Sequence, residues 1–210
     1  MEFFSILESL KEQYKDDMTI RKNGTILLSP GTIPNYRHML FTPLDNKLIE
    51  EFLISQYVHK FPKSYIEFLK YSNGANLCTV KMWHNIKKKR IPTACGLFTI
   101  YGLPRTQPYG RASEMEEPFD MRIEDLGRHD DVPSEWLKCG SYYRNYDFYA
   151  HTDIFIDPKD EKVYACIKNQ NAIVDSWNNL DECFCSIYHS FDDMKDEYDF
   201  EEIKKSAKAK

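Results

Sequence analysis

The chain has 210 residues and a formal net charge of −5, from 28 Lys and Arg residues against 33 Asp and Glu residues. Hydrophobic residues form 42% of it and aromatic residues 14%, which suffices for a core and argues against global disorder. No run approaches the ~18–20 apolar residues of a membrane helix, and residues 1–4 lack the basic start of a signal peptide. We therefore expect a cytoplasmic protein without membrane binding. The acidic balance also argues against direct nucleic-acid binding.

The first 44 residues predict a helix and a β-hairpin. Apolar residues recur at helical spacing from Glu2 to Tyr14. Asn23-Gly24 favours a tight turn between two short strand-forming segments, and residues 34–43 read as a connector. Because this stretch is too short for a core of its own, we expect residues 1–44 to be an extension packed on the main domain, residues 45–192.

Two consecutive helices are expected between residues 48 and 74. The apolar stripe of the first is Leu48, Ile49, Phe52, Leu53 and Tyr57, and that of the second is Tyr65, Ile66, Phe68 and Leu69. Phe61-Pro62 separates the two helices, because Pro fits the first turn of a helix. Asn73-Gly74 ends the second helix, because Gly and Asn favour a left-handed C-terminal cap.

The remainder predicts strands and a closing helix. Strand-like segments occupy residues 77–83, 95–103, 136–140, 142–156 and 162–168, with a charged loop at 84–93 and a long irregular region at 104–131. A helix is expected over residues 180–200, with a charged helix end or tail over residues 193–210. This order predicts an α+β fold with a single, largely antiparallel or mixed sheet and helices packed on one side.

The ordered landmarks resemble the SUKH superfamily, the Smi/Knr-type family of toxin-immunity proteins and cell-wall regulators. The residues that carry the resemblance include Phe61, Pro62, Phe68, Asn73, Gly74, Trp136 and Gly140, within residues 45–192. The resemblance implies a SUKH-like domain in which these residues are structural. It also implies a non-enzymatic bacterial immunity protein that binds and neutralises a cognate toxin domain, often a nuclease. The alternative is an interaction scaffold or regulator of the Smi/Knr type.

Motifs for catalysis and metal binding point to no specific chemistry. The six histidines lie in no recognisable catalytic motif, and no phosphate-binding loop or nucleophile elbow is present. The six cysteines form no C-x-x-C pair, and Cys185 with His189 supplies only two ligands on one helix. We expect free thiols, no catalytic residue, no metal and no cofactor, although a triad assembled from distant positions stays open.

Two segments are candidates for binding a protein partner. The first contains Tyr142, Tyr143, Tyr146, Asp147, Tyr149 and Asp153, and the second contains Glu114, Glu116, Glu117 and Asp120. Tyr is favoured at interfaces, but inward rings would be sheet core, so both interpretations stay open. The acidic segment either mimics the charge of a nuclease substrate or serves solubility. We expect a monomer or weak homodimer.

The run Lys87-Lys88-Lys89-Arg90 is basic and lies near Trp83 and His84. Such a run could contact phosphate, with the rings stacking on bases. A solvated loop between strands explains it more simply, because one basic run in an acidic chain is a weak nucleic-acid signal.

Overall fold

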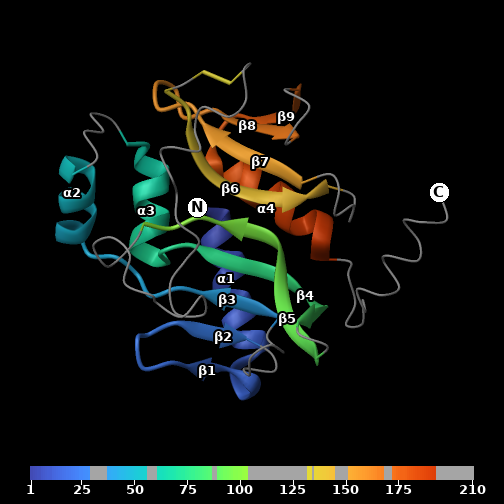
Figure 1. The fold of residues 1–210 in the computed structure, drawn as a ribbon. Helices are drawn as coiled ribbons and strands as arrows, with labels where there is room; N and C mark the ends of the chain where they lie inside the picture. Colours follow the sequence, from blue (N-terminus) through green and yellow to red (C-terminus); the bar gives the residue numbers. More distant parts are fainter. Residues whose placement is uncertain are drawn as a thin grey trace.

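The computed structural model describes residues 1–28, 37–55, 61–86, 89–103, 132–133, 135–144, 151–167 and 172–192 (Figure 1). Within these residues, nine strands form one antiparallel sheet accompanied by four α-helices. The strands lie in the sheet in the order in which they follow one another along the chain. The predicted α+β fold with a single sheet is confirmed, and the sheet is antiparallel throughout.

The elements have the following bounds. The helices are α1 (Glu2–Gln13), α2 (Asn46–Ser55), α3 (Lys63–Tyr71) and α4 (Leu180–Asp192), with a 3-10 turn at Lys15–Asp17. The strands are β1 (Thr19–Ile20), β2 (Ile26–Leu28), β3 (His38–Leu40), β4 (Ala75–Ile86), β5 (Lys89–Ile100), β6 (Leu137–Tyr143), β7 (His151–Ile156), β8 (Val163–Ile167) and β9 (Ala172–Trp177). None of the described helices is both long and apolar enough to cross a membrane.

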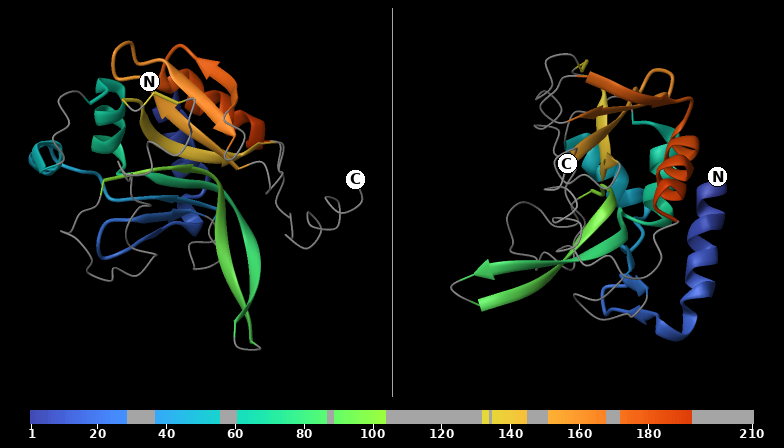
Figure 2. Two further views of the ribbon diagram at one scale, coloured as in Figure 1. Left: turned by 45° about the horizontal axis from the view of Figure 1, so that its top comes forward. Right: turned by 90° about the vertical axis from the view of Figure 1, so that its right-hand side faces the viewer.

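The helices α1, α3 and α4 cover one face of the sheet (Figure 2). Four phenylalanine rings meet where these helices contact β5. The Phe184 ring lies 5.2 Å from that of Phe3, 5.5 Å from that of Phe68 and 5.6 Å from that of Phe98, each in an edge-on arrangement. All four side chains are fully buried, so this cluster is the centre of the main core.

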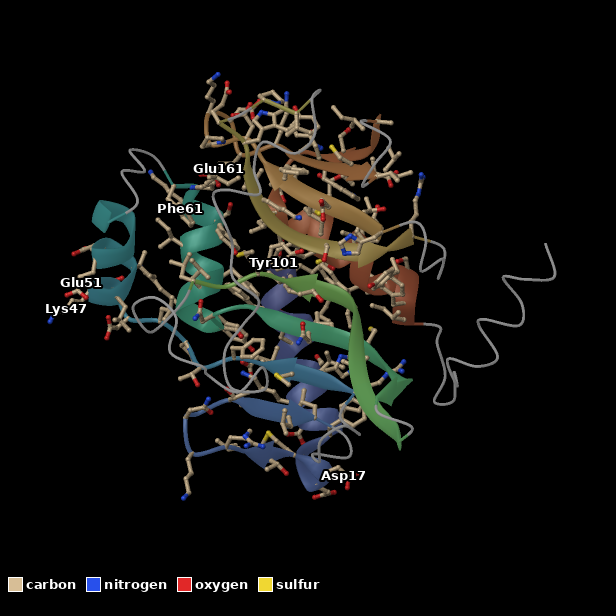
Figure 3. The ribbon with its side chains drawn as sticks, viewed as in Figure 1. Asp17, Lys47, Glu51, Phe61, Tyr101 and Glu161 are labelled. Atoms are coloured by element: carbon tan, nitrogen blue, oxygen red, sulfur yellow. The ribbon has the colours of Figure 1, made fainter. Side chains whose placement is uncertain are left out.

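Two helices begin on carboxylates supplied by the C-terminal half of the chain. Asp181 accepts hydrogen bonds from the backbone N–H groups of Glu2 and Phe3, both at 2.9 Å. Glu161 accepts bonds from the N–H groups of Lys63 and Ser64, and it lies beside Phe61 at the start of α3 (Figure 3). The first N–H groups of a helix have no partner within it, so these distant carboxylates fix where α1 and α3 begin.

Asn73 joins the end of the helical segment to the segment that follows β5. Its side-chain NH₂ donates to the carbonyl of Leu103, and its Oδ1 accepts from the N–H of Leu103, both at 2.7 Å. The backbones approach so closely that a Cβ added at Gly102 would lie 2.3 Å from the Asn73 carbonyl oxygen. The buried amide therefore acts as a piece of strand backbone, and Gly102 is required opposite it.

The structure corrects four expectations. The sequence predicted a connector where β3 forms, and it predicted no strand where β9 forms. The predicted loop at 84–93 belongs to the long β4–β5 hairpin, in which Ile86 pairs with Lys89. The predicted left-handed cap at Asn73-Gly74 is wrong, because α3 ends at Tyr71 and Ser72 is extended. Gly74 does have a φ of +90°, but it serves the turn into β4.

The first 44 residues belong to the same sheet and core as the rest. α1 contributes to the main core, and β1, β2 and β3 continue the sheet beyond β4. The predicted hairpin at Asn23-Gly24 is confirmed as the β1–β2 pair, with Gly24 at a φ of +87°. The segments 104–131 and 193–210 lie outside the described residues.

Phe68→Ala should lower the free energy of unfolding by ~3–5 kcal/mol, because it removes a fully buried ring from the phenylalanine cluster. Leu48→Ala, at a residue 38% exposed on α2, should lower it by less than ~1 kcal/mol. Urea unfolding of both variants measures the difference. Equal midpoints for the two would contradict the placement of Phe68.

His38 predicts a pH dependence of stability. It is 2% exposed, and burial lowers its pKa to about 3, with a further contribution from the charge of Arg37. In the unfolded chain a histidine has a pKa of ~6.5. As pH falls below that value, only the unfolded chain binds the proton, so stability falls by up to ~1.4 kcal/mol per pH unit. His38→Gln should show a shallower slope in urea unfolding between about pH 7 and pH 5. Parallel curves for variant and parent would contradict this.

Candidate functional site

The sheet face away from the helices carries a row of polar residues across four strands. Asn76 on β4 pairs with Thr99 on β5, Thr99 pairs with Ser141 on β6, and Ser141 pairs with Asp153 on β7. These four residues, here called the polar row, are between 2% and 8% exposed. Side chains of neighbouring residues in a strand take opposite faces. Ile154, next to Asp153, belongs to the main core, so the polar row lies on the face of the sheet that points away from that core.

A buried ion pair lies at one end of the polar row. The Lys138 Nζ atom is 2.9 Å from an Asp153 Oδ atom, and the two side chains are 12% and 2% exposed. The His151 ring nitrogen Nδ1 lies 3.7 Å from the other Asp153 oxygen. A buried charge is stable only when its partners hold it, so Lys138 and Asp153 are fixed relative to each other.

Half-buried aromatic rings surround this ion pair. The Tyr143 and His151 rings are a cross-strand pair with centroids 5.2 Å apart. Tyr101, labelled in Figure 3, follows β5; its hydroxyl is 3.1 Å from the Ser141 hydroxyl and its ring is 5.6 Å from the Lys138 Nζ atom. Each of these rings thus offers an apolar surface beside fixed polar groups.

A second aromatic cluster lies further along the same face. The Trp136 and Tyr164 rings stack with centroids 4.0 Å apart and an interplanar angle of 10°. They pack with Phe155, Cys166 and Val132 in a cluster separate from the main core. Tyr164 is half-buried whereas Trp136 is 8% exposed, so Tyr164 is the accessible ring of this pair.

The predicted binding residues are distributed over both faces of the sheet. Tyr143 and Asp153 lie on the helix-free face described above. Tyr142 lies on the opposite face, 5% exposed in the main core, where its hydroxyl bonds to Asp175 at 3.0 Å. Burial, followed by the charge of Asp175, raises the pKa of Tyr142 far above its usual value. The other predicted binding residues, Tyr146, Asp147, Tyr149, Glu114, Glu116, Glu117 and Asp120, lie outside the described residues.

The residues that carry the family resemblance lie inside the fold, in contact with other elements. Phe68 and Asn73 are fully buried, Phe61 is 7% exposed, and Pro62 immediately precedes α3. Trp136 stacks on Tyr164 as described. At Gly140 an added Cβ would lie 2.7 Å from the Thr99 carbonyl oxygen, so β5 and β6 require a glycine there.

The described cysteine thiols are free, and most are buried. Cys78, Cys139, Cys166 and Cys183 are buried, and Cys185 is half-buried. Burial raises the pKa of Cys166 to about 11, with a contribution from Asp153. Burial also raises the pKa of Cys185 to about 11, with a contribution from Asp181. Such thiols are protonated at neutral pH. Among the described residues, no three His, Cys, Asp or Glu side chains are grouped to hold a metal ion.

Four residues on this face were not predicted as site residues from the sequence: Tyr101, Lys138, Ser141 and His151. Tyr101 and Lys138 are separated by the long 104–131 segment, so only the β5–β6 pairing brings them together. No protein-family model matches the chain, and no curated protein matches it at a significant level.

Lys138→Met should lower the free energy of unfolding by about 3–5 kcal/mol, because it removes the ion-pair partner of a buried carboxylate. Lys138→Met/Asp153→Leu removes both charges and should recover most of the loss, with a coupling energy of about 1–3 kcal/mol. A double-mutant cycle in urea measures the coupling. Strict additivity of the two single changes would contradict the buried ion pair.

Proposed function

We propose that this protein binds another protein through the helix-free face, and that it is a cytoplasmic immunity protein that neutralises a cognate toxin domain by stoichiometric binding. The proposal is supported by half-buried rings around a fixed ion pair on that face. Tyr143, His151 and Tyr101 belong to β6, β7 and the segment after β5, which the sheet holds in one arrangement. Preorganised aromatic groups bind with a small loss of conformational entropy.

The energetics of interfaces favour this arrangement. Aromatic residues in the centre of an interface supply most of the binding free energy, and surrounding contacts exclude water. The Lys138–Asp153 pair lies near Tyr101 and His151 and keeps its polar groups in one geometry, which favours one partner over others. The immunity function itself rests on the family resemblance carried by the sequence of residues 45–192.

The test uses the polypeptide encoded by the adjacent gene. Co-expression should protect cells from that polypeptide, and the two proteins should co-purify as a 1:1 complex. Failure to protect, or protection without a complex, would contradict the proposal. Turnover of a substrate by the purified chain would favour an enzyme instead.

Tyr143→Ala should weaken binding to that polypeptide by about 30-fold or more in Kd, which corresponds to the ~2 kcal/mol of a central aromatic contact. Tyr71→Ala is the matched control, because Tyr71 is also half-buried but stacks on Phe4 in the helical layer, with centroids 4.6 Å apart. The control should bind like the parent. Isothermal titration of folded proteins measures both. Equal Kd values for the two variants would place the interface elsewhere.

A further inference from the structure

The strand β9 forms an open edge of the sheet. It pairs with β8 alone, and among the described residues no other backbone group bonds to its outer side. The opposite edge is β1, which has two residues against the six of β9 (Figure 1). An open edge presents a row of unpaired N–H and C=O groups to which another strand can bind. β9 is therefore the longer of the two edges at which the sheet can be extended.

The edge lacks the charged and proline residues that usually prevent such pairing. β9 contains no Lys, Arg or Pro. Its one charged residue, Asp175, lies 3.0 Å from the Tyr142 hydroxyl and 3.6 Å from the Arg144 Nε atom, so its charge is balanced within the chain. Ile173 is 51% exposed. An exposed apolar side chain on such an edge strand favours pairing with another strand.

A β-bulge gives β9 a symmetric arrangement of faces. Cys166 and Ala165 of β8 pair with Ile173 and Asp175, which leaves Val174 as the extra residue. Val174 and Trp177 pack against the main core, and Asp175 bonds into it. The residues at positions 173 and 176 are instead exposed. The order of half-buried and exposed residues is therefore the same when β9 is followed in either direction.

This symmetry makes β9 complementary to a second β9. Two identical strands related by a two-fold axis are antiparallel, as is every strand pair of the sheet. With the axis between Val174 and Asp175, each residue lies opposite one that belongs to the same face, as an antiparallel pair requires. The opposite pairs are then Ile173 with Ser176, Val174 with Asp175, and Ala172 with Trp177. A shift by one residue would place Asp175 opposite itself and mix the two faces, so one register is favoured.

We propose that two copies of this chain associate through antiparallel pairing of their β9 strands, so that the two sheets become one. The dimer is weak, with a Kd on the order of 100 μM, because six residues of each chain make a small interface. Association stops at two copies, because the other edge has only two paired residues. The inference goes beyond the proposed function, because pairing at an edge covers neither face of the sheet.

The first test is sedimentation equilibrium of the full chain from about 5 to about 500 μM. The parent should change from monomer to dimer, and Ile173→Lys should associate at least ~10-fold more weakly, because a charge on an edge strand opposes pairing. The matched control is Ile20→Lys, at a residue 62% exposed on β1, and it should associate like the parent. Thermal unfolding verifies that both variants retain the parent fold.

Three results would overturn the proposal. The parent could stay monomeric at the highest concentration, or Ile173→Lys could associate like the parent. Equal weakening by Ile173→Lys and Ile20→Lys would indicate pairing of β9 with β1 of the next copy, which is a head-to-tail arrangement rather than a closed dimer.

The second test measures the register. Ile173→Cys and Ser176→Cys are prepared as separate proteins and then mixed under mild oxidation, with the parent as the background for the native thiols. Opposite residues of an antiparallel pair have Cβ atoms ~4.5–5.5 Å apart, which a disulfide can join after a small shift. The mixture should give a covalent dimer on a non-reducing gel, and each variant alone should give no more than the parent. Equal cross-linking by the mixture and by the separate variants would overturn the register. Because no toxin is used, failure of either test leaves the proposed function standing.

Discussion

The phenylalanine cluster is the contact on which the rest of the fold depends. Phe3, Phe68, Phe98 and Phe184 come from α1, α3, β5 and α4, so a single cluster joins the first, middle and last parts of the chain. Aromatic rings bury large apolar areas, and their edge-on packing fixes the mutual orientation of the elements that carry them. The carboxylate caps on α1 and α3 depend on this packing, because each reaches its helix from another part of the structure.

The two faces of the sheet serve different physical purposes. The helix-covered face is held by non-directional burial of apolar groups, which supplies most of the stability. The helix-free face carries the polar row and a buried ion pair, whose desolvation offsets much of their attraction. Such groups add little stability but tolerate few alternative geometries. A face built in this way suits selective recognition better than additional core.

Local patterns predicted the elements that depend on local interactions. Helical spacing identified α1 and α3, and Asn23-Gly24 identified the first hairpin. β3 and β9 were not predicted, because each owes its conformation to pairing with the neighbouring strand. Residues 84–93 were interpreted as a charged loop, because their polarity favours a loop and the pairing of β4 with β5 is not visible in the local sequence. The Asn73–Leu103 bonds and the polar row were not predictable, because they join residues far apart in sequence.

The order of the strands bears on how the chain is made. Every described strand pairs with its neighbour in sequence, so most contacts form within segments that leave the ribosome together. The helices depart from this order, and α1 does so most, because it packs on α4 and its first N–H groups bond to Asp181. At roughly 5–20 residues per second, the nascent chain carries the apolar face of its first helix for on the order of ten to forty seconds before that partner is synthesised. The chain is therefore most prone to aggregate during its own synthesis, until the last helix has emerged from the ribosome.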